Sequence, residues 1–345
     1  MSLRFHARRI VVKRVRGEEV AKFKVVITDL GYQSYQPEKD ELAKVDAEVV
    51  LAECSTEQEV GEACKDADGV ITRAAPVGAD AIGQMEKCRV ISRYGVGVDN
   101  VDIPAATAKG IVVANVRDYC NEEVSDHALA LLLACVRRIS SRDRQVRAGM
   151  WDIGAKEPIY RIAGKTLGLI GYGAIARTLH RKVKGFNLAE VLVYDPYVPA
   201  EQIAQAGAKS VELDELLKRS DYISIHAPLT DSTRHMIGEK QFEMMKPTAI
   251  LVNTSRGPLV DPDALYSALK NGQIASAGID VYEPEPPQKD CKLFELDNVV
   301  LTDHAGWYSE ESQLALQQLA ARNVALVLSG KEPLYCVNPE VIKKQ

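Results

Sequence analysis

The stretch that decides the fold reads Gly168-Leu-Ile-Gly171-Tyr-Gly173-Ala-Ile-Ala176. It overlaps an apolar run, Leu167–Ile170, that predicts a buried strand, and it opens a stretch of helical character. Gly171 permits a tight turn, and Gly173 lets the backbone approach a pyrophosphate bound at the free N–H groups of the helix N-terminus. Ala176, in place of a third glycine, still allows close packing of helix on strand. The sequence therefore predicts the strand–turn–helix unit of a dinucleotide-binding sheet.

Asp195 lies at the end of the next predicted strand, 19 residues after Ala176. A carboxylate at this position accepts hydrogen bonds from the ribose hydroxyls of the dinucleotide. The same negative charge repels a 2′-phosphate. The spacing therefore predicts NAD, rather than NADP, as the cofactor.

The same alternation of a short apolar run, a turn and a helical stretch extends through the chain from Lys24. Continuous apolar runs are typical of parallel strands that helices cover on both faces. The pattern predicts an α/β protein with two doubly wound parallel sheets. The runs are Val25–Thr28, Val49–Ala52, Val70–Thr72, Val90–Ser92, Ile111–Ala114, Leu167–Ile170, Val191–Tyr194, Tyr222–Ile225, Ile250–Val252, Ala277–Val281 and Val299–Thr302.

Two predicted helices, Asn121–Ser140 and one from about Ser309 to Gly330, connect the two sheets. A chain that crosses at about 121 and returns at about 309 makes the first domain discontinuous. We expect one domain from residues 24–120 with 309–345, and a second from residues 121–308. Residues 1–24 carry a formal charge of +6 and leave −11 for the remainder. Residues 1–23 are therefore predicted to be a basic extension, either simply solvated or an arm that binds a partner.

Composition excludes several classes of protein. The net charge of −5 argues against a general electrostatic grip on nucleic acid or an anionic membrane surface. No apolar run reaches the roughly 18 residues that a membrane-spanning helix requires. The seven cysteines contain no C-x-x-C pair, so we expect neither a disulfide framework nor a metal site, and a reducing cytoplasm fits best.

Ionisable residues follow the predicted strands of the second half. Arg256, His226 and His304 follow apolar runs within four residues, Asp280 lies within one, and Glu285 stands in a proline-rich loop. In open α/β sheets a ligand binds at the carboxyl ends of the strands, where these side chains should gather. An Arg, a carboxylate and a His beside a nicotinamide suit the interconversion of a keto acid and a hydroxy acid. We expect His226 to be structural or to line the cofactor site, and His127 and His180 to be structural.

Four motifs resemble those of the D-isomer-specific 2-hydroxyacid dehydrogenases, and the resemblance covers nearly the whole chain from about Lys24. It is nearest the branch related to C-terminal-binding proteins, through His304-Ala-Gly-Trp-Tyr-Ser309 and Tyr335-Cys-Val-Asn338. It implies a flavodoxin-like substrate-binding domain and a Rossmann NAD-binding domain. The motifs are Tyr94-Gly-Val-Gly-Val-Asp-Asn-Val-Asp102, Ile250-Leu-Val-Asn-Thr-Ser-Arg-Gly-Pro-Leu-Val-Asp261, Gly278-Ile-Asp-Val-Tyr-Glu-Pro-Glu-Pro286 and Leu301-Thr-Asp-His-Ala-Gly306.

The resemblance implies a catalytic trio. Arg256 would hold the substrate carboxylate, and His304 would donate or accept the proton. Glu285 would bond the other ring nitrogen of His304 and is preferred over Glu283 by its spacing from Asp280. The sequence departs from the family at Asp303, where the family has proline, so a carboxylate precedes the predicted acid/base.

The resemblance also implies contacts to cofactor and substrate. Substrate contacts are expected from the backbone of Val96 and Gly97, from Arg93 or Arg73, and from Trp307. The expected cofactor-binding residues are Gly171, Tyr172, Gly173, Ala174, Ile175, Asp195, Ala227, Pro228, Thr233, Thr254, Ser255, Arg256, Asp280, His304 and Gly306.

The leading interpretation is an NAD-dependent dehydrogenase of a small 2-hydroxy acid, such as a glyoxylate, hydroxypyruvate or lactate relative, acting as a homodimer. One alternative is an NAD(H)-sensing binding protein of the corepressor type. A second is a phosphoglycerate dehydrogenase without the regulatory domain, because the chain ends at Gln345. The acidic character of the chain favours the first interpretation over the binding protein.

Overall fold

The computed structural model describes residues 21–151 and 158–344. The chain divides into two compact units. Among the described residues, the first unit joins residues 21–119 with residues 309–344, and the second unit is Cys120–Tyr308. Both divisions lie within one residue of the boundaries expected from the sequence. The basic extension expected at residues 1–23 lies almost wholly outside the described residues.

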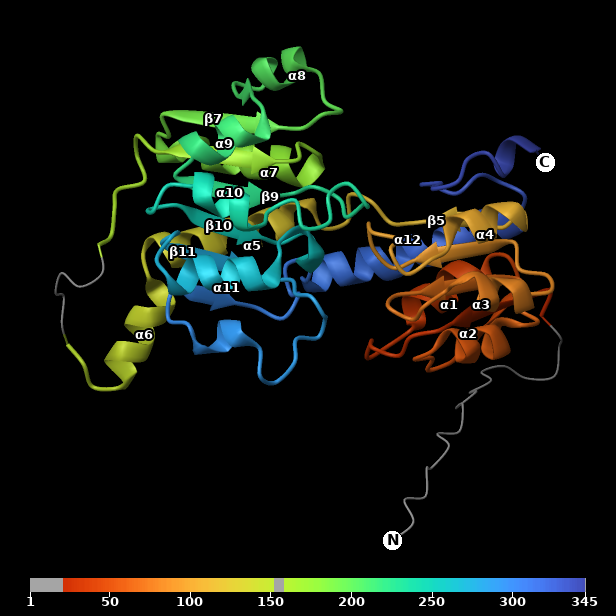
Figure 1. Ribbon diagram of the computed structural model, residues 1–345. Helices are drawn as coiled ribbons and strands as arrows, with labels where there is room; N and C mark the ends of the chain where they lie inside the picture. Colours follow the sequence, from red (N-terminus) through yellow and green to blue (C-terminus); the bar gives the residue numbers. More distant parts are fainter. Residues whose placement is uncertain (1–20, 152–157, 345) are drawn as a thin grey trace, which may run out of the picture. The chain divides into compact units, whose positions relative to one another are not determined.

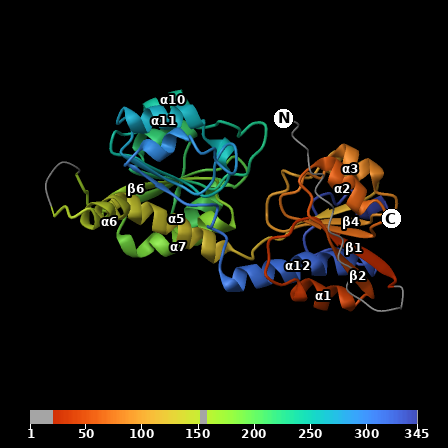
Figure 2. The same ribbon diagram turned by 90° about the horizontal axis from the view of Figure 1, so that it is seen from below.

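The first unit contains a five-stranded, all-parallel sheet in the order β2-β1-β3-β4-β5. Helices α2 and α3 cover one face and α1 and α12 the other (Figure 2). This is the flavodoxin-like order, which confirms the fold predicted for this half. The strands are β1 (Phe23–Ile27), β2 (Ala47–Leu51), β3 (Gly69–Thr72), β4 (Val90–Arg93) and β5 (Val112–Ala114). The helices are α1 (Gln36–Ala43), α2 (Glu57–Cys64), α3 (Ala79–Gln84), α4 (Ile103–Ala108), α12 (Glu310–Leu328) and the short η4 (Ile342–Lys344).

The second unit contains a seven-stranded, all-parallel sheet in the order β12-β11-β10-β9-β6-β7-β8 (Figure 1). Strand order reverses between β6 and β9, as in Rossmann folds, which confirms the predicted class. The strands are β6 (Thr166–Ile170), β7 (Glu190–Tyr194), β8 (Lys209–Ser210), β9 (Tyr222–Ile225), β10 (Ile250–Asn253), β11 (Ser276–Ile279) and β12 (Val299–Leu301). The helices are α5 (Asn121–Val136), α6 (Ile139–Arg147), α7 (Ala174–Val183), α8 (Ala200–Gln205), α9 (Leu213–Arg219), α10 (Glu239–Met244) and α11 (Pro262–Lys270), with the short η1 (Lys184–Phe186), η2 (Gly257–Leu259) and η3 (Lys292–Glu295).

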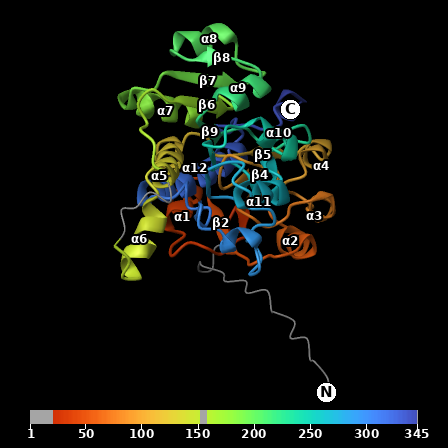
Figure 3. The same cartoon turned by 60° about the vertical axis from the view of Figure 1, so that its left-hand side comes forward.

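Every apolar run predicted as a strand overlaps one of the observed strands. β3, β6, β9, β10 and β11 are buried at every residue. The two-residue strand β8 carries no sequence signal, since Lys209 and Ser210 are exposed polar residues at the sheet edge (Figure 3).

The helix predicted over Asn121–Ser140 is wrong in its extent. α5 ends at Val136, and Arg138 adopts a left-handed conformation (φ 53°) that starts α6 in a new direction. By contrast, α12 begins as predicted: the Ser309 side chain accepts a hydrogen bond from the Ser312 N–H at 2.9 Å and caps the helix. α12 ends just before Gly330, which is left-handed at φ 80°.

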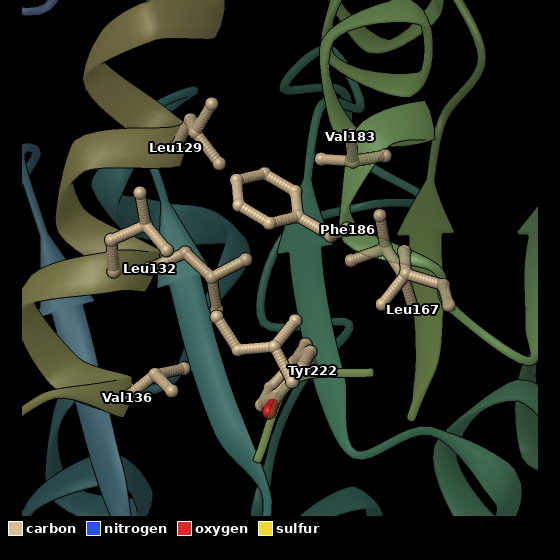
Figure 4. A pocket seen from close by; sticks show the side chains of 10 residues that line it. Leu129, Leu132, Val136, Leu167, Val183, Phe186 and Tyr222 are labelled. Atoms are coloured by element: carbon tan, nitrogen blue, oxygen red, sulfur yellow. The ribbon is translucent and has the colours of Figure 1, made fainter. Parts of the chain in front are cut away.

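Helix α5 is fixed to its own unit by apolar packing. Leu129, Leu132 and Val136 line one apolar pocket together with Val183 and Phe186 (Figure 4). The lining is made of hydrocarbon and aromatic side chains, so the pocket is part of the packing between α5, α7 and the sheet. Among the described residues, no helix combines the length and the apolar character needed to cross a membrane.

Candidate active site

The glycine-rich turn joins β6 to α7 beside the loop that follows β9. Gly171 is left-handed (φ 87°), and a Cβ atom there would lie 2.8 Å from backbone atoms of His226 and Ala227. Only glycine fits such a position. Around a Cβ atom placed on Gly173, which is the N-cap of α7, no described atom outside the adjacent chain segment lies within 4 Å. The turn therefore leaves open space at the start of α7, where an anion is favoured by the helix N-terminus.

Asp195 follows β7 and faces this turn. Its carboxylate accepts the Tyr172 N–H at 2.7 Å and the Tyr197 N–H at 2.8 Å. The acidic group thus lies directly beside the predicted pyrophosphate-binding turn. The Tyr172 side chain, by contrast, is buried, and its hydroxyl is 2.7 Å from Nδ1 of His180. Only the backbone of Tyr172 is therefore placed to contact a cofactor.

The loops after β9 and β10 carry the other polar groups of this edge. Thr233 Oγ1 donates to the Pro228 carbonyl at 2.7 Å, and Ser255 Oγ donates to the Ile225 carbonyl at 2.8 Å. Thr254 Oγ1 is buried without a hydrogen-bond partner among the described residues. A buried hydroxyl without a partner is costly unless a ligand supplies one. Together with the open turn at Gly173, it fits a dinucleotide along the switch point of the sheet.

His226 lies at the same edge but is turned inward. Its Nε2 is 2.9 Å from Ser224 Oγ, and burial lowers its pKa to about 4. The ring is therefore neutral near neutral pH. This agrees with the expectation that His226 is structural or lines the cofactor site.

Arg256 follows β10 and caps the short helix η2. Its guanidinium donates to the carbonyl of Ser255 at 2.8 Å, and its side chain is half-buried. A Cβ atom on Gly257 would lie 1.9 Å from the Tyr282 carbonyl oxygen, so the Arg256 loop is pressed against the loop that leads to Glu285.

His304 and Glu285 are in direct contact. Nδ1 of His304 makes a short hydrogen bond to a carboxylate oxygen of Glu285. Both side chains are about one-third exposed, at 36% and 37%. With Nδ1 bound to Glu285, Nε2 is the ring nitrogen at which His304 can exchange a proton with a ligand. Asp303, the departure noted in the sequence, is exposed.

Glu283, the alternative to Glu285, has different partners. It makes a short contact with Arg234, and its other oxygen is 2.6 Å from Nε2 of His235. Burial would raise the pKa of Glu283, but the hydrogen bonds from His235 and Arg234 outweigh it and lower the pKa. Geometry therefore pairs His304 with Glu285 and gives Glu283 a role in its own loop.

Asp280 lies beneath the His304 loop and is 1% exposed. It accepts the backbone N–H groups of Ala305 and Gly306, each at 3.0 Å, and the Thr302 hydroxyl at 2.6 Å. Nε2 of His127, from α5, is 3.2 Å from the same carboxylate. The His127 contact was not anticipated from the sequence, because 175 residues separate His127 from Thr302.

In the first unit, the expected substrate residues lie at the carboxyl ends of β3 and β4. Backbone N–H groups from Arg73 to Ala75 donate to the Asp29 carboxylate at 2.7 to 2.9 Å. Burial raises the pKa of Tyr32, while the charges of Arg73 and Arg93 act to lower it, and its buried hydroxyl has no hydrogen-bond partner in the described part of the chain. Tyr32 carries no signal in the sequence.

The loop after β4 contains Val96 and Gly97. Val96 is 43% exposed, and its carbonyl accepts from the Asn115 amide at 2.6 Å. Trp307, in the second unit, packs edge-on against Tyr308.

Within residues 21–151 and 158–344, no group of three or more His, Cys, Asp or Glu side chains is placed to hold a metal ion.

Comparison with known proteins identifies the family of the chain. Residues 129–306 match the family model of the D-isomer specific 2-hydroxyacid dehydrogenase NAD binding domain. A glyoxylate reductase of Korarchaeum cryptofilum is 42% identical over 287 residues, which cover 82% of this chain and 86% of that protein. A D-3-phosphoglycerate dehydrogenase of Methanocaldococcus jannaschii is 41% identical over 310 residues, which cover 89% of this chain but 58% of that protein.

A solved structure shows the same likeness. The glyoxylate reductase from Paecilomyes thermophila superposes with a TM-score of 0.83 at 29% identity, covering 92% of this chain and 99% of that one. NAD as the cofactor and the NAD-dependent dehydrogenase class are thereby confirmed. The closer kinship with the C-terminal-binding-protein branch stays a prediction. The chain belongs to the D-isomer-specific 2-hydroxyacid dehydrogenase family.

Proposed function

We propose that this enzyme interconverts a small 2-keto acid and its D-2-hydroxy acid, with His304 as acid/base, Glu285 as its orienting partner and Arg256 as the carboxylate anchor. The observation that carries the proposal is the bond between Nδ1 of His304 and Glu285. A carboxylate on one ring nitrogen fixes the tautomer and leaves the other nitrogen to move the proton.

In the direction of reduction, the guanidinium of Arg256 binds the substrate carboxylate and polarises the adjacent carbonyl. NADH, when bound, supplies the hydride that adds to the carbonyl carbon. Nε2 of His304 gives its proton to the carbonyl oxygen, and Glu285 stabilises the imidazolium before transfer. In oxidation, neutral His304 takes the hydroxyl proton back.

The cofactor would lie along the switch point of the second unit. The free N–H groups at the start of α7, from Gly173 to Ile175, would hold the pyrophosphate, and Asp195 would accept from the ribose hydroxyls. Thr254 and the backbone of Ala227 and Pro228 would line the nicotinamide half. Among these, the Thr254 hydroxyl has no competing partner among the described residues.

The first unit would supply the rest of the substrate contacts, through the backbone N–H groups of Val96 and Gly97. The substrate that we favour is a small acid such as glyoxylate or hydroxypyruvate. A second candidate, 3-phosphohydroxypyruvate, is supported by a specific observation: Arg73 follows β3 and Arg93 ends the neighbouring strand β4, where it is paired with Thr72. Two arginines at one edge of the sheet suit a substrate with a second anionic group.

The test follows NADH absorbance while glyoxylate, hydroxypyruvate, pyruvate, 3-phosphohydroxypyruvate and branched 2-keto acids are offered to the wild type and to Arg256→Lys. We expect turnover, a D-configured product, and a KM for the acid about 10- to 100-fold higher in the variant, because lysine cannot reproduce the bidentate grip. Preferential turnover of 3-phosphohydroxypyruvate that falls in Arg73→Gln would favour the second candidate. NADH binding without turnover of any acid would contradict the proposal and favour a nucleotide-sensing binding protein.

We also propose that the enzyme is a cytoplasmic homodimer. α6 has no buried residue, and Ile139, Val146 and Trp151 in and after it are 58%, 54% and 84% exposed. Apolar side chains gathered on one exposed helix are typical of an interface. The seven cysteines contain no C-x-x-C pair, which suits a reducing compartment. Light scattering after size exclusion should give twice the 37.9 kDa chain mass, and a Val146→Glu variant should lower it.

A further inference from the structure

His127 is brought to the active-site edge by a match between helix and strand spacing. His127 and Leu131 are four residues apart on α5 and share one face, with a rise of about 6 Å between them. Gly278 lies in β11 and Asp280 directly follows the strand, so the two are two residues apart along an extended chain, with a rise of about 6.6 Å. A Cβ atom on Gly278 would lie 2.8 Å from Cβ of Leu131, so glycine lets α5 lie close to the sheet. Leu131 therefore faces Gly278, and His127 faces Asp280.

Thr302 completes this set from the neighbouring strand. Ile279 and Leu301 are paired in the parallel register of β11 and β12, so Asp280 and Thr302 follow as the next neighbours. Thr302 Oγ1 donates to Asp280 at 2.6 Å, and Nε2 of His127 is 2.9 Å from the same Oγ1. Three separate elements thus meet at one buried carboxylate.

The direction of each hydrogen bond can be worked out from the number of protons available. Burial would raise the pKa of Asp280, but the bonds from His127, Thr302 and Gly306 outweigh it and lower the pKa, so the carboxylate only accepts. Thr302 has a single hydroxyl proton, and it donates this proton to Asp280. Thr302 Oγ1 must therefore accept from His127, which means that His127 carries a proton on Nε2.

The same carboxylate holds the backbone of the His304 loop. Ala305 and Gly306 donate to it, and the His304 N–H donates to the Asp280 carbonyl at 2.9 Å. His304 has a left-handed backbone (φ 59°), which is unfavourable for a residue with a side chain and persists only where its surroundings impose it. The bonds to Asp280 are the local constraint on that conformation.

We propose that His127 is a positioning residue for His304: its Nε2–H completes the donor set of Asp280 and Thr302, and Asp280 in turn fixes the loop that presents the acid/base. This inference rests on the role proposed above for His304. Without the His127 donor, Thr302 and the carboxylate of Asp280, which is 1% exposed, each have one hydrogen-bond donor fewer. The loop then loosens, and a displacement of about 1 Å at a reacting group can cost on the order of a hundredfold in rate.

Three variants separate positioning from packing. His127→Leu removes the donor at similar volume, and His127→Gln restores an N–H donor at similar reach. Cys135→Ala is the matched control, because Cys135 lies about two turns further along the same face of α5, is buried, and faces Gly278. Each variant is measured for kcat, KM of the acid, the Kd of NADH, melting temperature and deuterium uptake of peptides covering 303–308.

We expect kcat to fall about 10- to 100-fold in His127→Leu, with KM and the Kd of NADH changed less than threefold, and faster deuterium uptake at residues 305–306. His127→Gln should recover most of kcat and the slow uptake. Cys135→Ala should lower only the melting temperature. The inference is overturned if His127→Leu keeps both the wild-type kcat and the wild-type deuterium uptake. It is also overturned if His127→Gln does not recover kcat and Cys135→Ala loses as much kcat as His127→Leu. If the wild type turns over no acid, but deuterium uptake at residues 305–306 is still faster in His127→Leu than in the wild type, the proposed function is refuted. The effect of His127 on the loop is then still established.

Discussion

Glu285 bonds Nδ1 of His304, whereas Glu283, two residues earlier in the same loop, bonds Nε2 of His235. The two carboxylates thus serve different histidines. Glu283 also contacts Arg234 and so ties its loop to the segment after β9. The structure therefore supplies a matched pair of carboxylates, one on the proposed acid/base and one away from it.

The first prediction uses this pair. Glu285→Gln should lower kcat about 10²- to 10⁴-fold, because a neutral amide no longer stabilises the imidazolium or selects its tautomer. Glu283→Gln should change kcat less than threefold. Steady-state rates of NADH oxidation at saturating acid measure both. Equal losses in the two variants, or a larger loss at Glu283, would contradict the assignment.

The second prediction contrasts two glycines of the turn. Gly171→Ala should destabilise the protein by about 1–3 kcal/mol, because φ is 87° and the methyl group would meet the backbone of His226 and Ala227. Gly173→Ala should leave the melting temperature nearly unchanged, since the space around it is open. It should nevertheless weaken NADH binding tenfold or more, by keeping the pyrophosphate away from the backbone. Thermal unfolding and fluorescence titration with NADH distinguish these effects. Normal NADH affinity in Gly173→Ala would argue against the proposed cofactor position.

The third prediction concerns the choice of cofactor. Asp195→Asn keeps an oxygen for the Tyr172 N–H but removes the charge that repels a 2′-phosphate. The ratio of kcat/KM for NADPH to that for NADH should rise by about 10- to 100-fold, mostly through a lower KM for NADPH. Parallel assays with the two reduced cofactors measure this ratio. An unchanged ratio would place the discriminating group elsewhere.

The fourth prediction is a pH dependence of stability. His226 has its pKa lowered to about 4 in the folded protein, against about 6.5 when unfolded. As pH falls from 7.5 to 5, the unfolded state takes up a proton that the folded state does not, so the free energy of unfolding decreases, by about 2 kcal/mol from this group. Urea unfolding of wild type and His226→Gln should show the wild-type advantage shrinking over this window. An advantage that stays constant or grows at lower pH would contradict the neutral state of His226 in the folded protein.

The strands and the cofactor turn could be predicted from sequence because their signals are local. An apolar run such as Leu167–Ile170 reports burial on both faces, and Gly171 reports a backbone conformation that few other residues adopt. The end of α5 could not be predicted in this way. The break at Arg138 is a left-handed residue without a glycine or proline to mark it.

The site was only partly predictable, because the residues that surround its proposed catalytic groups come from distant parts of the chain. Spacing favoured Glu285 over Glu283, and the structure pairs Glu285 with His304. The contact of His127 with Asp280 and Thr302 depends on the registry of a helix against two strands. A histidine in a helical stretch carries no sign of such a contact in the sequence, and Tyr32 near Arg73 and Arg93 was missed for the same reason.

The central claim is that His304 moves the proton, and His304→Asn tests it most directly. Asparagine tolerates the left-handed backbone at this position and can still bond Glu285, but it cannot act as an acid/base near neutral pH. With the 2-keto acid that the wild type reduces fastest, we predict a loss of kcat of at least about 10²-fold, with the Kd of NADH and the melting temperature unchanged. A variant that keeps more than a third of the wild-type kcat would contradict the account.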